Sequence, residues 1–205
     1  MKGARGGDTF GTGEMFMRHP FERVPAGARG RILTPLLAAT ALIFVTWVLT
    51  VAPMSNEQAP LSVSSFGMAG SLARAREMMA SWDERARLSG AFGIGFDFLQ
   101  LLVYPTTFAL ACAWAAQMFR ARGRAALAAA GVLLAWGQCL AALCGTVQNA
   151  VMMSLLLGSG SEAWVDVSYW ATLVKLILLA AGPAYAALGG AALLFGGPAG
   201  GRVET

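Results

Sequence analysis

Charged residues are scarce in this chain: Asp, Glu, Lys and Arg make up 13% of its 205 residues, whereas 57% are hydrophobic. Soluble domains carry about 25% charged residues, so a soluble fold of this composition would leave a large apolar surface in water. The same numbers exclude a disordered chain, because disorder goes with low hydrophobicity and high net charge. The composition therefore indicates an integral membrane protein.

Histidine and cysteine are also rare. The single histidine, His19, lies outside every long apolar run, which excludes haem or chlorophyll ligated through histidine and a Ser–His protease in this chain alone. The three cysteines, Cys112, Cys139 and Cys144, form no C-x-x-C pair of the kind that thiol oxidoreductases use. We interpret them as packing residues. The sequence offers no metal-ligand set, cofactor motif or nucleophile–base arrangement, and we expect no metal, no cofactor and no enzymatic activity.

Four long apolar runs divide the chain, and about 20 residues of helix suffice to cross a bilayer. The runs cover residues 32–52, 91–118, 125–157 and 167–190. The short alternating segments of a transmembrane barrel are missing. The sequence thus predicts an all-α fold, a polytopic bundle of four transmembrane helices over residues 32–195. Residues 1–31 and 196–205 are predicted to be tails, the first irregular and ordered only by contact with a partner.

The distribution of Lys and Arg predicts the orientation. Ten of these residues lie in the segments 1–31, 120–124 and 196–205, against four in the connections on the other side. The positive-inside rule therefore places both termini in the cytoplasm, with the bacterial inner membrane as the location. The net charge of +4 is explained by this topology and indicates no nucleic-acid partner.

The connection between the first two runs contains a further periodic segment. Apolar residues recur at helical spacing from Leu72 to Ala86, with charged residues on the opposite side, which predicts an amphipathic outer-face helix over about 70–88. Such a helix could lie at the lipid surface with Trp82 at headgroup depth. We favour a cap packed on the outer mouth of the bundle, because lipid-surface helices are usually basic and this one is nearly neutral.

Polar residues inside the apolar runs form the candidate site. The cluster comprises Asp97, Gln100 and Tyr104 on the second run, Gln138, Gln148 and Asn149 on the third, and Lys175 on the fourth. At ~1.5 Å of rise per residue, Asp97 lies about 9 Å below the outer end of its run, and Lys175 and Asn149 about 12 Å below theirs. The three helices are therefore expected to bring an acid, a base and an amide to one level, with Gln138 nearer the midplane.

Two interpretations of this cluster remain open. A lone charge at the centre of a membrane helix costs at least about 2.5–3.5 kcal/mol, so Asp97 and Lys175 are expected to pair. In the first interpretation, the pair and its amides only fix the register of the helices. In the second, they line a pocket that is open to the outer face and that binds a polar headgroup or relays a proton.

Glycine and tryptophan residues are interpreted as packing and interface residues. Small residues on membrane helices allow close approach between helices, and aromatic residues gather at the membrane surface. The residues singled out are Gly93, Gly131 and Gly145 for helix packing, Trp136 for packing, and Trp82, Trp164 and Trp170 for the outer interface.

Four segments of the chain and one lysine form a combined pattern. They read RAREMMASWD at 74–83, GFDFLQLLVYPTT at 95–107, LAWGQ at 134–138 and VQNA at 147–150, followed by Lys175. The combination resembles a family of uncharacterised bacterial four-helix membrane proteins. The resemblance covers about residues 70–190 and implies a fold but no reaction.

Three classes of function follow from these observations. The favoured one is an accessory or structural subunit, or an assembly factor, of a larger membrane complex, with other membrane protein subunits and membrane lipids as partners. The alternative is a small carrier or a protein that binds a lipophilic ligand at the site of Asp97 and Lys175. An enzyme is the least favoured class. No inverted repeat typical of carriers is visible in the sequence.

Overall fold

The computed structural model describes residues 19–195, and every regular element in that range is helical. Four helices are long: α2, α5, α6 and α7. Helices α3 and α4 lie between α2 and α5, whereas short turns connect α5 to α6 and α6 to α7. The elements are η1 (Pro20–Arg23), α2 (Ala26–Val51), η2 (Ala52–Met54), α3 (Val63–Gly67), α4 (Leu72–Ala80), α5 (Glu84–Ala121), α6 (Ala125–Leu156) and α7 (Glu162–Phe195).

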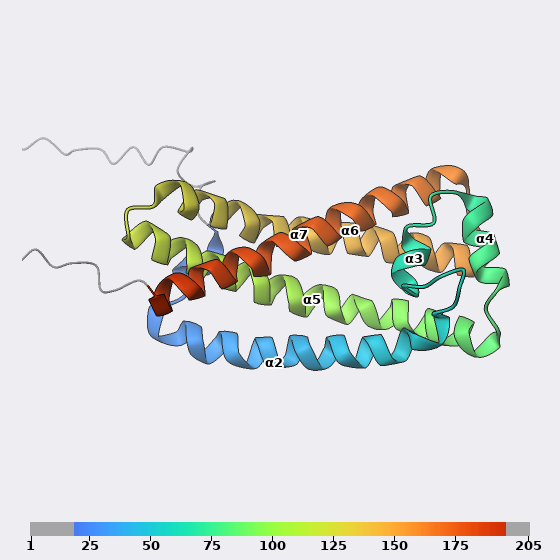
Figure 1. Cartoon of the computed structure of the whole chain (residues 1–205), viewed down its shortest axis with the longest axis horizontal. Coiled ribbons are helices and arrows are strands. Elements are labelled where there is room, and N and C mark those ends of the chain that lie inside the picture. The colour runs from blue at the N-terminus through green and yellow to red at the C-terminus, as the bar shows by residue number, and fades with distance from the viewer. Residues whose placement is uncertain (1–18, 196–205) are drawn as a thin grey trace, which may run out of the picture.

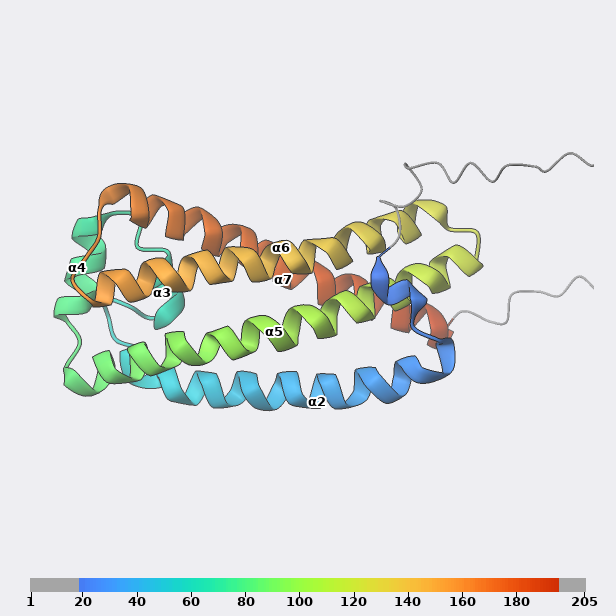
Figure 2. The ribbon, with the colours of Figure 1, turned by 180° about the vertical axis from the view of Figure 1, so that it is seen from behind.

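The four long helices run side by side as one elongated bundle (Figure 1). Helix α5 is central, since it packs against α2, α6 and α7, while α6 also packs against α7. Helix α7 crosses α5 obliquely, and the view from behind places α5 and α6 on the opposite face (Figure 2). Between α5 and α6, Gly123 adopts a φ of +71°, which only glycine takes up without strain. The start of α2 and the end of α7 lie at the same end of the bundle (Figure 1).

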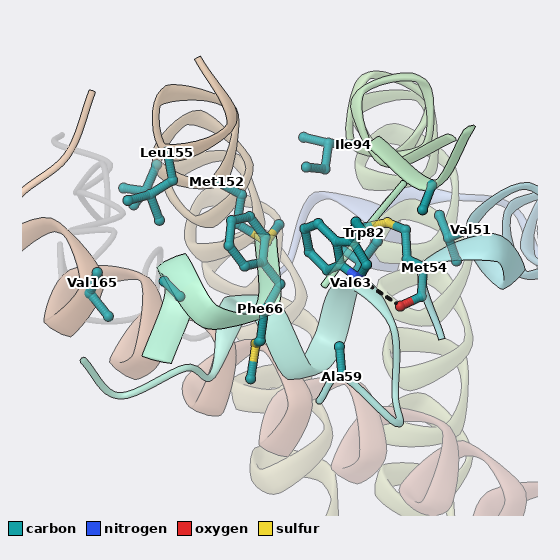
Figure 3. Packing of buried hydrophobic residues seen from close by; sticks show 14 residues of the cluster. Val51, Met54, Ala59, Val63, Phe66, Trp82, Ile94, Met152, Leu155 and Val165 are labelled. Carbon is teal, nitrogen blue, oxygen red and sulfur yellow. Dashed lines mark hydrogen bonds between the residues drawn. The ribbon is translucent and has the colours of Figure 1, made fainter. Parts of the chain in front are cut away.

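Residues 52–83 form a cap over the other end of the bundle. The buried indole of Trp82 donates from Nε1 to the carbonyl oxygen of Met54 over 2.9 Å and meets the ring of Phe66 edge-on (Figure 3). Around it, Ile94 of α5 and Met152 of α6 belong to the same apolar cluster. Trp82 therefore holds the cap on the bundle, as the favoured of the two interpretations expects.

The helix predicted over about 70–88 is wrong in its extent. Helix α4 ends at Ala80, and a turn follows before α5 begins at Glu84. The side chain of Asp83 accepts a hydrogen bond from the N–H of Ala86 over 2.7 Å, which makes Asp83 the N-cap of α5. The apolar periodicity runs through this break because Trp82 and Ala86 face the same core.

The irregular tail predicted over residues 1–31 is also wrong for its last part. Helix α2 begins at Ala26, and η1 precedes it; residues 1–18 lie outside the described range. The carboxylate of Glu22 forms an ion pair with Arg120 over 2.9 Å, and the backbone carbonyl oxygen of Glu22 accepts a hydrogen bond from Nε2 of Gln117 over 2.7 Å. This part of the chain thus packs on its own bundle. The start of α2 predicted from the apolar run is too late. Arginine residues interrupt an apolar run, but their side chains can extend from a helix without ending it.

The other three predicted runs correspond to helices of longer or nearly equal extent. Helices α5 and α7 continue beyond the predicted 91–118 and 167–190, and α6 matches 125–157 to within one residue. Within the described residues, four helices are long and apolar enough to cross a membrane. Large apolar side chains are exposed along all four, for example Leu49, Leu102, Leu133 and Ile177.

Candidate functional site

One face of α5 carries three buried polar residues at helical spacing. Asp97, Gln100 and Tyr104 follow each other at intervals of three and four residues, and each is at most 7% exposed. Residues at these intervals share a helix face, so the helix directs all three side chains toward the interior.

Asp97 is the centre of the site. Its Oδ2 accepts a hydrogen bond from Nδ2 of Asn149 over 2.9 Å, and the Nζ of Lys175 lies 3.8 Å from the same oxygen. The side chains of Asp97 and Lys175 are 8% and 12% exposed. The structure thus brings together the acid, base and amide that the sequence placed at one level. Asn149 is the closer partner of the carboxylate, and the ammonium lies beyond ordinary hydrogen-bond distance.

A cavity of about 580 Å³ lies beside this group, between α2, α5 and α7. Asp97, Gln100, Tyr104 and Lys175 line its polar side, and Ser64 of α3 lines its capped end. Apolar and aromatic side chains of the three long helices form the rest of the wall, namely Leu37, Ala41, Ile43, Phe44, Trp47, Val103, Phe108, Leu176, Leu179 and Pro183. We call this space the α2–α7 cavity.

Two polar atoms of residues that line this cavity have no hydrogen-bond partner among the described residues. They are Nε2 of Gln100 and the hydroxyl of Tyr104, and both are buried. A buried polar group without a partner costs about 1–3 kcal/mol, so native proteins satisfy nearly all of them. Gln100 and Tyr104 stand on adjacent turns of α5, and both residues line the same cavity.

A second cavity of about 320 Å³ continues the first toward the end where α2 begins. The two share Leu37, Phe108 and Pro183 in their walls, and the second is otherwise lined by apolar side chains such as Trp114 and Met118. We call this second space the apolar extension. The two spaces are thus neighbours between α2 and α7, with polar residues in the wall of the first and apolar residues in the wall of the second.

Two residues of the predicted cluster lie elsewhere. Gln148 lies beside the cap: its Nε2 contacts the sulfur of Met152 over 3.8 Å and is 2.7 Å from where a Cβ on Gly67 would stand. Gln138 donates to the carbonyl oxygen of Leu178 on α7 over 2.9 Å. The prediction of one cluster is therefore wrong for these two glutamines. Adjacent helical residues point about 100° apart, so Gln148 and Asn149 cannot face the same neighbour.

The three singled-out glycines lie where helices approach closely. A Cβ on Gly93 would stand 2.3 Å from Val51, and one on Gly131 would stand 2.2 Å from the hydroxyl of Tyr185. At Gly145 it would stand 2.3 Å from Leu101 and 3.1 Å from Lys175. Gly145 therefore allows α6 to approach α5 beside the candidate site.

Among the tryptophans, Trp164 and Trp170 near the start of α7 are 51% and 62% exposed, as interface residues would be, whereas Trp82 is buried. Trp136 is 44% exposed, and its ring meets that of His19 edge-on at 4.8 Å. It thus packs against the N-terminal segment and not inside the bundle. Burial lowers the pKa of His19 below 6.5, although Glu22 opposes the shift.

The contribution of α2 to the site was missed in the sequence. Thr40 shares a hydrogen bond with Thr107 of α5 over 2.9 Å, and Nε1 of Trp47 donates to the carbonyl oxygen of Gly93 over 3.1 Å. Both residues line the α2–α7 cavity with Phe44 between them. Thr40, Phe44 and Trp47 follow each other at intervals of four and three residues, which puts a hydroxyl and two aromatic rings on one helix face. This spacing could have indicated the contribution of α2.

Within residues 19–195, no three His, Cys, Asp or Glu side chains gather as a metal site would require. In comparisons with known proteins, no family model, no curated protein and no solved structure matches the chain. Its fold and cavity therefore define it only as an all-helical protein with a buried polar site beside an apolar passage.

Proposed function

We propose that this chain is a non-catalytic protein of the bacterial inner membrane that binds an amphiphilic molecule from the bilayer in the α2–α7 cavity. The observation that carries the proposal is the pair of unpartnered buried polar atoms, on Gln100 and Tyr104, in the wall of a cavity that is otherwise mostly apolar. Binding sites for small molecules combine an apolar lining with a few convergent polar groups in this way.

The surface of the bundle supports insertion into a bilayer. Leu42, Leu49 and Leu102 are 68–70% exposed. An apolar surface of this kind is compatible with lipid, whereas in water it would cause the protein to aggregate. The ten Lys and Arg residues of the tails and of segment 120–124 favour an orientation with both termini in the cytoplasm. The cap of residues 52–83 then covers the outer end.

The position of the cavity favours entry from the side. Its walls are the lengths of α2, α5 and α7, and its capped end is closed by α3 with Ser64. Helix α2 packs along α5, while the cavity separates it from α7. A molecule that is already in the bilayer would therefore enter between α2 and α7, with its polar part at Asp97 and Lys175.

The test is recovery of the bound molecule. The protein is purified in a mild detergent, extracted with organic solvent and analysed by mass spectrometry. Ala41→Trp would place an indole in the cavity, whereas Leu42→Trp would change the adjacent residue, which is 68% exposed and lies outside the cavity wall. We expect one amphiphile to be retained by the wild type and by Leu42→Trp and lost from Ala41→Trp. Equal retention in all three would refute the proposal.

The accessory or structural subunit favoured by the sequence remains a second candidate. Residues 19–25 belong to the tail that was predicted to contact a partner, and they make contacts to α5 and α6 of the same chain. Deletion of residues 1–18 tests it, because this change leaves η1 and the bundle intact. Loss of a stoichiometric partner on purification would support the accessory role, and unchanged recovery would oppose it.

A further inference from the structure

We infer that the molecule bound in the α2–α7 cavity is an isoprenoid quinone or a close analogue: an uncharged, flat ring with carbonyl oxygens and a long apolar chain. This inference rests on the proposed function and adds the chemical class of the ligand. Four features of the cavity carry it: its free donors, its charge, its aromatic walls and its apolar extension.

Free hydrogen-bond donors stand on residues that line the cavity. Nε2 of Gln100 can only donate, and it has no partner. The hydroxyl of Tyr104 has none either and can donate through its hydrogen. The ammonium of Lys175 lies 3.8 Å from its nearest acidic oxygen and keeps hydrogens free. A ligand that offers acceptors, as carbonyl oxygens do, would match these three donors.

The charges of the site favour an uncharged ligand. Asp97 and Lys175 carry opposite unit charges and face each other, so the pair is neutral. A carboxylate or phosphate ligand would add a negative charge that no further cation among the residues lining this cavity balances. An uncompensated charge away from water is strongly unfavourable. A neutral carbonyl can accept from Gln100, Tyr104 and Lys175 without this penalty.

Aromatic side chains stand on two walls of the cavity. Phe44 and Trp47 of α2 lie nearly parallel with ring centroids 6.2 Å apart, and Tyr104 and Phe108 of α5 lie 6.3 Å apart. All four line the cavity. Aromatic walls favour a flat ring that stacks offset or edge-on against them, over the branched and flexible glycerol head of an ester lipid.

The apolar extension fits the chain of such a molecule. It leads away from the polar residues, past Phe108 to Trp114 and Met118. From Tyr104 to Met118, α5 advances about 21 Å at its rise of ~1.5 Å per residue. The ring would thus lie near the capped end, and the chain would follow α5 toward the other end between α2 and α7.

The test is a binding panel measured by calorimetry in detergent micelles. The probes are decyl-benzoquinone, palmitate and monopalmitoylglycerol, which present a flat dicarbonyl, an anion and a neutral ester. We expect saturable binding of the quinone and at least tenfold weaker binding of the other two. Gln100→Leu and Tyr104→Phe should each weaken quinone binding three- to tenfold, because each removes one donor and keeps the approximate shape. Thr106→Val, which changes an exposed residue outside the cavity, should leave binding unchanged.

The outcomes separate this inference from the proposed function. If palmitate or monopalmitoylglycerol binds as tightly as the quinone, and Ala41→Trp abolishes that binding, the cavity binds an amphiphile but the ring-carbonyl inference is refuted. If quinone binding survives Gln100→Leu and Tyr104→Phe undiminished, the inference is likewise refuted. If no probe binds in a manner sensitive to Ala41→Trp, both the inference and the proposed function fail.

Discussion

The pairing of Asp97 with Lys175 can be tested by a double-mutant cycle. The changes are Asp97→Asn and Lys175→Met, alone and together. Asparagine at position 97 keeps an oxygen for Nδ2 of Asn149, which donates to Asp97 over 2.9 Å. The cycle therefore removes the charge and leaves this hydrogen bond available, and methionine retains most of the volume of the lysine chain.

The magnitude follows from the geometry. At 3.8 Å and an effective dielectric constant of about 20, two unit charges attract each other by about 4 kcal/mol. Removing one member also leaves the other buried and unpaired, and such changes lower the free energy of unfolding by about 3–5 kcal/mol. Each single variant should therefore lose this amount. The double variant should lose no more than the worse single variant, which corresponds to a coupling of about 3–4 kcal/mol.

The assay is reversible unfolding in mixed micelles by titration with a denaturing detergent, followed by circular dichroism. The control combines Asp97→Asn with Tyr185→Phe, which removes a hydrogen bond to Leu127 about 15 Å further along α7 from Lys175. Sites this far apart are independent, so these two losses should add. Additive losses for Asp97→Asn and Lys175→Met as well would show that the two residues do not interact, and the centre of the candidate site would be lost.

Three further changes test the packing and the N-terminal segment by denaturation or fluorescence. Gly145→Ala should lower the free energy of unfolding by about 1–3 kcal/mol, because its Cβ would stand 2.3 Å from a methyl group of α5; Gly95→Ala, which meets open space, should not destabilise the protein. Trp82→Phe should lower the free energy of unfolding by about 1–2 kcal/mol, because the hydrogen bond to Met54 is lost. Trp82→Ala should lower it by about 3–5 kcal/mol. An unchanged melting temperature in both variants would contradict the role of Trp82 in holding the cap. Because burial lowers the pKa of His19 below 6.5, the N-terminal segment of residues 19–25 binds fewer protons when it is docked on the bundle than when it is released. Its docking should thus be complete above about pH 6.5 and weaken as the pH falls through that value; tryptophan emission should follow this titration in the wild type and not in His19→Asn.

The approach of Asp97, Lys175 and Asn149 could be predicted from the sequence because depth along a membrane helix depends only on the rise per residue. The depths of the three residues, each counted along its own helix, agreed within about 3 Å. Because a buried charge requires a partner, this agreement predicted that Asp97 and Lys175 lie together. The rotation of each helix is harder to predict. On α6, every face is apolar enough to be buried, so the sequence did not show that Asn149 turns toward α5 and Gln148 toward the cap.

The cap was predicted only in outline because its structure depends on contacts between distant segments. Helix α3 approaches the bundle so closely that the carbonyl oxygen of Gly67 accepts from Ser168 over 3.1 Å. Ser62, just before α3, takes a φ of +54°, which is unusual for a residue with a side chain. Its hydroxyl donates to the carbonyl oxygen of Val51 over 2.6 Å. A strained backbone that is held by one buried hydrogen bond leaves no periodic signal in a sequence.

The looseness of α2 connects the fold to the proposed entry of a ligand. Helix α2 has few buried residues along its length, and polar contacts to α5 at Thr40 and Trp47 hold its middle. Its last turn is held by the bond from Ser62 to Val51. Segments with few buried contacts open at low free-energy cost, so for the proposed entry we expect α2 to be the wall of the cavity that moves. The polar residues, in contrast, lie on α5 and α7, which are packed against α6 and do not need to move. In the proposed function, the recognition groups would stay on these packed helices while α2 moves on the side where the ligand enters.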